Sequence, residues 1–359
     1  MTTARKHLVD AERSACYHLV SRCVRRAFLC GDAGEHRREW IAAAVELTSR
    51  CFAVEILGFA IMSNHLHMVV KTQPTRARRW SDQVVAERWA ALYPLRGADG
   101  EPEAWPPEKI QALAANHDRC AALRERLASL SWMMKIIKER IAKRANREDG
   151  CRGHFWEQRF NSSRLADQAA LLSCMAYVDL NPIRAKMADR PETSDFTSVH
   201  ERICARQSHR QACALTTAGT TNGDTATTQE ARQIRANGPE HGLFIAPMVA
   251  CVVGDSDSRD APRPITLDNY IDLVDATGRI IKTGKRGHIP AHLLPILQRL
   301  DLDVDAWLRL MRSHGRFIGT AIGHYAARAA VAAKRGLNWI RNTIPELFSG
   351  RPPPQASAT

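Results

Sequence analysis

The sequence predicts an α+β fold in which an antiparallel sheet carries helices on one face. Short runs rich in β-branched and aromatic residues alternate with longer runs whose apolar residues recur at helical spacing. Two of the short runs also follow each other directly, separated by a turn at Ser63 and Asn64, which indicates a hairpin. The expected order is strand, helix, strand, strand, helix, strand, helix.

Each element has its own signal in the sequence. An amphipathic helix is expected at 35–51, and an insertion at about 74–118. Asp167 is expected to cap a helix over 168–181, which Pro182 ends. Strands are expected at 16–24, 52–61 and 65–71, and within 155–165. One long helix is expected where apolar residues recur at spacings of four and three, at Leu123, Leu127, Leu130, Met134, Ile137 and Ile141.

Composition divides the chain into parts. Residues 1–204 form the first domain, including the insertion. Residues 205–262 are rich in Thr, Ala and Gly and almost without large apolar residues, so a flexible linker is expected there. Apolar periodicity returns over 263–345, which predicts a small helical domain, and 346–359 form a tail.

The charge of the chain indicates an acidic partner. A net charge of +13 and a pI near 9.6 favour nucleic acid, and the alternative is a solvated basic surface. The ten cysteines are scattered singly without a Cys-x-x-Cys pair, so a reduced, cytoplasmic protein without a structural zinc site is expected. No signal peptide and no membrane span are evident in the sequence.

The stretch "MSNHLHMVV" places His65 and His67 on the same face of a strand. Two imidazoles at this spacing can hold one divalent ion, but a third ligand has to come from elsewhere in the fold. With 14 histidines in 359 residues, about 0.5 such pairs are expected by chance. A half-exposed strand with polar residues outward is therefore the alternative for this pair.

The helix at 168–181 offers further candidates. Tyr177 lies roughly 110° from the centre of the apolar stripe, so it is not an obvious core residue, and Asn181 lies one turn further on. The helix thus presents a nucleophile and an amide oxygen on one face. The alternatives are a packed helix tyrosine and an asparagine that caps the helix before Pro182. The apolar stripe itself consists of Leu171, Cys174, Met175 and Val178.

Three stretches, "MSNHLHMVV", "GHFWEQRF" and "LLSCMAYVDLNPIRA", together resemble the single-tyrosine transposases of the HUH class. The resemblance is strongest to the branch of REP-associated tyrosine transposases, in which the helix ends in a Tyr-x-x-x-Asn-Pro-x-Arg-Ala pattern. It covers about residues 10–200 and implies a ferredoxin-like sandwich, which agrees with the expected element order. The absence of a second tyrosine near Tyr177 on the helix fits the single-tyrosine class.

The resemblance also implies a chemistry. His65 and His67 would bind Mg²⁺ or Mn²⁺, with Asn181 as the third protein ligand. Tyr177 would attack a phosphodiester of single-stranded, hairpin-containing DNA, leaving a 5′-phosphotyrosine link and a free 3′-OH. Such enzymes act as dimers, so a homodimer is expected, in the cytoplasm and associated with the nucleoid when bound to DNA.

Basic residues around these motifs are candidates for phosphate contacts. A second function remains open, a DNA- or RNA-binding regulator that keeps the fold but no longer cuts. A metal-dependent hydrolase is a third interpretation, and it would not need Tyr177. The candidate DNA contacts are Arg22, Arg25, Arg26, Lys138, Lys143, Arg144, Arg159, Arg164 and Arg184.

Overall fold

A computed structural model describes residues 9–219, 238–253, 264–283, 289–312, 317, 319–341 and 343–344. In this part of the chain the main sheet has five strands in the order β2-β3-β1-β6-β7. The first four pair antiparallel as predicted, but β7 pairs parallel to β6, so the sheet is mixed. The strands are β1 (Cys16–Arg22), β2 (Val54–Ile61), β3 (His65–Thr72), β6 (Asn161–Leu165) and β7 (Ala321–Ile322).

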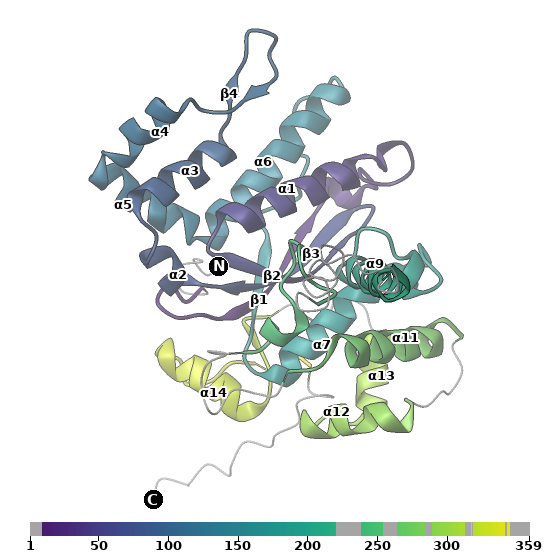
Figure 1. The fold of residues 1–359 in the computed structure, drawn as a ribbon. Coiled ribbons are helices and arrows are strands. Elements are labelled where there is room, and N and C mark those ends of the chain that lie inside the picture. The colour runs from purple at the N-terminus through teal and green to yellow at the C-terminus, as the bar shows by residue number, and fades with distance from the viewer. Residues whose placement is uncertain are drawn as a thin grey trace, which may run out of the picture.

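One face of the sheet is covered by α1 (Arg37–Cys51) and α6 (Leu130–Glu148), as Figure 1 shows. Along the chain, α1 lies between β1 and β2 and α6 between β3 and β6, which gives a β-α-β-β-α-β succession. Tyr17, Leu19 and Met68 point from the sheet into the cluster that these helices share.

The one long helix that was expected is two helices, because the helical structure is interrupted at Ala128 and Ser129, between α5 (His117–Leu127) and α6. Both helices pack into the same apolar cluster, which explains why the apolar periodicity runs through the break. The other elements between β3 and α6 are α2 (Pro74–Arg78), α3 (Asp82–Leu92), β4 (Leu95–Arg96), β5 (Pro102–Glu103), α4 (Pro107–Ala114) and α5 (His117–Leu127).

Helices also cover the opposite face, so the prediction of helices on one face only is wrong. There α7 (Gln168–Asp179), α9 (Ser198–Gly219) and α11 (Leu267–Thr283) surround a second apolar cluster, on the far side of the sheet from α1 in Figure 1. The reason lies in the strands. Leu57 and Val69 point into this second cluster, while neighbouring residues point into the first, so both faces of the sheet are apolar and need cover.

A flexible linker was expected over 205–262, but the described residues before and after its Thr-rich part are folded. Helix α9 runs on to Gly219, and the segment 238–253 packs against the sheet, where Ala246 N donates to Ile56 O at 2.7 Å. The fully buried Arg202 donates to the carbonyls of Leu57 and Ala246 and so ties α9 to β2 and to this segment. Residues 220–237 and 254–263 lie outside the described residues.

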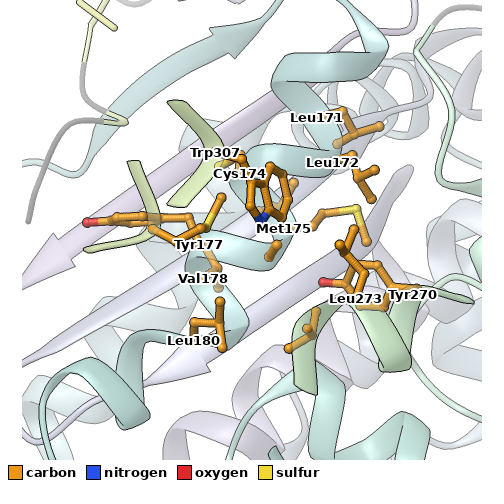
Figure 2. Packing of buried hydrophobic residues seen from close by; sticks show 14 of the residues in the cluster. Leu171, Leu172, Cys174, Met175, Tyr177, Val178, Leu180, Tyr270, Leu273 and Trp307 are labelled. Atoms are coloured by element: carbon orange, nitrogen blue, oxygen red, sulfur yellow. The ribbon is translucent and has the colours of Figure 1, made fainter. Parts of the chain in front are cut away.

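The C-terminal segment is helical as predicted, but it shares its core with the first part of the chain. Trp307 and Tyr270 lie in one cluster with residues of α7, as Figure 2 shows. The described helices of this segment after α11 are α12 (Leu294–Arg299), α13 (Val304–Arg312) and α14 (Tyr325–Lys334). None of the helices in the described ranges is both long and apolar enough to cross a membrane. The tail 346–359 lies outside them.

Candidate functional site

A cavity of about 290 Å³ lies where the end of β1 and the start of β3 meet α7 and the short helix α8 (Asn181–Arg184). It brings together all four residues proposed from the sequence for catalysis and metal binding. Three of the nine candidate DNA contacts line it as well. The residues around the cavity are Arg22, Arg26, Met62, Asn64, His65, His67, Tyr177, Asn181, Arg184 and Ala185.

The two histidines of β3 lie side by side, with ring centroids 4.7 Å apart. Burial, with smaller effects of Arg22 and Arg184, lowers the pKa of His65 to about 4. Burial together with His65 and His18 lowers the pKa of His67 well below its usual value of 6.5. Both imidazoles are therefore neutral at pH 7, which is the form that ligates a cation.

The orientation of His65 follows from its hydrogen bonds. Asn64 Nδ2 donates to Arg26 O at 3.0 Å, so the amide oxygen of Asn64 is the atom that faces His65. That oxygen lies 2.6 Å from His65 Nδ1 and can only accept. The proton is therefore on Nδ1, and the lone pair of Nε2 is left available to the cavity.

Tyr177 is more deeply buried than its helical position suggests. Asp167 caps α7 as predicted, accepting from Ala170 N at 2.8 Å, but every residue of the helix is buried. Tyr177 is 2% exposed, and the ring of Phe317, from the C-terminal segment, packs against it with ring centroids 4.9 Å apart. In Figure 2 the Tyr177 ring extends away from Trp307, with its hydroxyl outermost.

Arg184 joins the tyrosine to the asparagine. Its guanidinium carbon lies 3.9 Å from the Tyr177 ring centroid, and the group hydrogen-bonds to the Tyr177 hydroxyl and to Asn181 Oδ1. A guanidinium only donates, so the phenol oxygen accepts and faces a positive charge. Asn181 does not cap α7, since Leu180 holds that position and Asn181 begins α8.

The cavity offers three possible ligands for a divalent cation but no carboxylate. Two neutral imidazoles and one amide oxygen, whose second lone pair remains after the bond from Arg184, can each ligate it. Among the described residues no group of three or more His, Cys, Asp or Glu forms a metal site. The cavity lining holds three arginines and no carboxylate, so we expect a cation to bind together with an anionic group such as a phosphate.

The other candidate DNA contacts lie elsewhere. Lys138 and Arg159 line a separate cavity of about 490 Å³ beside α6. The remaining residues are Arg25, exposed and outside both cavities; Lys143, paired with Glu139 at 2.5 Å; Arg144, 3.8 Å over the Trp40 ring; and Arg164, paired with Asp10 at 3.5 Å.

Two residues next to the cavity were missed by the sequence analysis. His18 Nε2 lies 2.9 Å from His67 Nδ1, and His18 Nδ1 lies 2.7 Å from Phe317 O. A histidine inside the strand expected at 16–24 was a signal, but its proximity to His67 depends on the pairing of Val20 with His67, which the sequence does not reveal. Phe317 is 299 positions away from His18, and no pattern links the two.

Comparisons with known proteins give little. No protein-family model matches the chain, and no curated protein matches it. A solved structure of a REP-associated tyrosine transposase bound to a REP hairpin is similar over 57% of this chain and 86% of that one, with 13% identity and a TM-score of 0.34. A likeness of this strength identifies neither fold nor function.

Proposed function

We propose that this protein cleaves and rejoins single-stranded, hairpin-containing DNA through a covalent link to Tyr177. The observation that carries the proposal is the single cavity in which His65, His67, Tyr177 and Asn181 meet among arginines. The resemblance of the sequence motifs to single-tyrosine HUH transposases supports the same chemistry. A cavity rich in guanidinium groups suits a substrate with phosphates.

In the proposed reaction the Tyr177 oxygen attacks a phosphorus atom of the DNA backbone. The bond from phosphorus to the 3′-oxygen breaks, and that oxygen takes up a proton to leave as a 3′-OH. The phosphate stays on Tyr177 through the 5′ side of the cut, and attack by another 3′-OH reverses the step and rejoins a strand. Since bond energy is kept in the link, no ATP is needed.

The residues around Tyr177 have distinct parts in this step. Arg184 donates to the phenol oxygen and balances the negative charge that develops as its proton leaves. Arg22 and Arg26 hold the phosphate from the β1 side of the cavity. A divalent ion, Mn²⁺ or Mg²⁺, held by His65, His67 and Asn181, would orient a nonbridging oxygen and neutralise charge on the phosphate.

The test uses labelled single-stranded hairpins taken from the DNA that flanks the gene, incubated with Mn²⁺ or Mg²⁺ and analysed on a denaturing gel. We expect a DNA–protein adduct that disappears with EDTA and with Tyr177→Phe. Tyr93→Phe is the matched control, because Tyr93 is outside the cavity and partly exposed. An adduct that persists in Tyr177→Phe would contradict the proposed nucleophile.

A second function is favoured by one observation, the burial of Tyr177 beneath Phe317. A protein that binds DNA or RNA without cutting needs no accessible nucleophile. If the protein binds the hairpin but forms no covalent adduct with Mn²⁺ or with Mg²⁺, a DNA- or RNA-binding regulator that does not cut would be favoured. The expected homodimer and cytoplasmic location remain predictions, and light scattering of the protein with and without the hairpin tests the former.

A further inference from the structure

His18 is buried in the middle of the sheet, and both of its ring nitrogens are engaged. Its Nδ1 faces the carbonyl oxygen of Phe317 at 2.7 Å. A carbonyl can only accept, so His18 Nδ1 carries a proton and donates it. The ring is 1% exposed and its two hydrogen-bond partners are a carbonyl and another imidazole, neither of which is a carboxylate, so burial keeps the ring neutral and its Nε2 is an acceptor.

The protonation of His18 determines which nitrogen of His67 carries a proton. Phe317 O, His18 and His67 form a hydrogen-bonded row in that order. His18 Nε2 lies 2.9 Å from His67 Nδ1, and the two rings are stacked with an interplanar angle of 10°. Because His18 Nε2 accepts, His67 Nδ1 has to be the donor. His67 then carries its only proton on Nδ1, and the lone pair of Nε2 remains for the cavity that His67 lines.

We propose that His18 is a positioning residue that, anchored by the carbonyl of Phe317, holds His67 in the Nδ1–H tautomer with Nε2 available to a divalent cation. The inference rests on the proposed function only in making His67 a metal ligand. Asn64 gives His65 the same tautomer, so the two histidines offer equivalent nitrogens to one ion.

The anchor comes from the C-terminal segment and is itself held in place. Ser163 Oγ donates to Phe317 O at 3.3 Å and accepts from Gly319 N at 2.8 Å. The ring of Phe317 packs against Tyr177, so one residue contacts both the nucleophile and the row of histidines. Phe317 is in this way linked to both Tyr177 and His18, the two sides of the proposed site.

The first measurement reads the tautomer directly, with no metal or DNA present. Long-range ¹H–¹⁵N spectra of the full chain labelled with ¹⁵N-histidine report which ring nitrogen carries the proton, and a His67→Gln spectrum assigns the signals of His67. We expect Nδ1–H for His67 in the unmodified protein. We expect His18→Phe, which fills the space without an acceptor, to lose that preference. His18→Gln, whose side-chain oxygen can accept near the Nε2 position, should restore it.

The second measurement is the affinity for Mn²⁺, followed by electron paramagnetic resonance of the free ion in the presence of the hairpin. We expect the dissociation constant to rise about 10- to 100-fold in His18→Phe and to stay within about threefold in His18→Gln. Leu19→Ala is the matched control. It disturbs the same strand, but its side chain points into the cluster on the other face.

The outcomes separate the two proposals. An Nε2–H tautomer of His67 in the unmodified protein overturns the role of His18. So does a His18→Phe protein that folds and keeps both the tautomer and the Mn²⁺ affinity. Failure of the unmodified protein to bind Mn²⁺ with DNA, alongside the expected tautomers, counts against the proposed function and leaves the hydrogen-bonded row in place.

Discussion

Arg184 contacts two proposed site residues at once, the ring and hydroxyl of Tyr177 and the amide oxygen of Asn181. We predict that Arg184→Lys forms the DNA adduct about 10- to 100-fold more slowly, since lysine keeps the charge but loses the planar fork that reaches both partners. Arg25→Lys, outside the cavity, serves as the control and should react at the normal rate. An unchanged rate in Arg184→Lys would refute the role of the guanidinium.

The buried histidines predict how stability depends on pH. His18 and His65 have a pKa of about 4 in the folded protein and near 6.5 when unfolded, because burial disfavours the charged ring. Between these values only the unfolded state binds the proton. The free energy of unfolding should therefore fall as the pH drops from about 6.5 to about 4, by up to about 1.4 kcal/mol per pH unit for each ring.

Urea unfolding at pH 7, 6 and 5 measures this slope. His18→Gln removes one of the titrating rings, so its stability should fall less steeply over the same range. Equal slopes for the two proteins would show that His18 does not resist protonation in the folded state.

The spacing of residues in the sequence was enough to predict which cavity residues lie close together within one strand or around one helix end. His65 and His67 share a strand face, and Tyr177, Asn181 and Arg184 share a short stretch around one helix end, so local geometry already links them. The burial of Tyr177 could not be predicted, because the ring that covers it comes from a segment 140 positions later. Only the tertiary structure places Phe317 there.

At the scale of elements, Asp179 joins three helices. From the end of α7 it accepts hydrogen bonds from Ser198 Oγ and Val199 N at the start of α9 and from the hydroxyl of Tyr270 in α11. Burial raises the pKa of this carboxyl, opposed by Arg202 and by these hydrogen bonds. The junction holds the helix of Tyr177 against its neighbours.

We predict that Asp179→Ala lowers the free energy of unfolding by about 3–5 kcal/mol, because three buried donors lose their acceptor. Asp189→Ala, which removes an exposed partner of Lys282, should leave the free energy of unfolding almost unchanged. Urea denaturation of the two variants compares them. A similar small loss in both would mean that the junction contributes little.

The order of strands and helices was largely predictable from the sequence, but the layer of helices on the second face of the sheet was not. Strand and helix patterns gave the order of β1, α1, β2, β3, α6, β6 and α7, because each has an apolar period of its own. The almost continuous apolar run of β2 was a signal for a sheet covered on both faces, which the one-face prediction did not use. The short strand β7 carries no pattern over two residues.

At the scale of the whole molecule, the apolar cluster shared by α7 and the C-terminal helices joins the two parts of the chain into one core. We predict that a chain ending at 262 does not fold cooperatively, because the loss of Tyr270, Trp307 and their neighbours leaves the apolar surface of α7 uncovered. Calorimetry and near-ultraviolet circular dichroism of the truncated and full chains make the comparison. A truncated chain that melts cooperatively would show that residues 1–262 fold independently of the C-terminal helices.

The late position of Phe317 in the chain has a consequence for the protein during its own synthesis. About 140 residues separate Tyr177 from Phe317, and at roughly 10 residues per second their translation takes on the order of 10 s. Throughout that interval the histidine row lacks its anchor and the tyrosine lacks its neighbour. A nascent chain still on the ribosome would therefore lack, at the proposed site, the contacts that Phe317 makes with Tyr177 and His18.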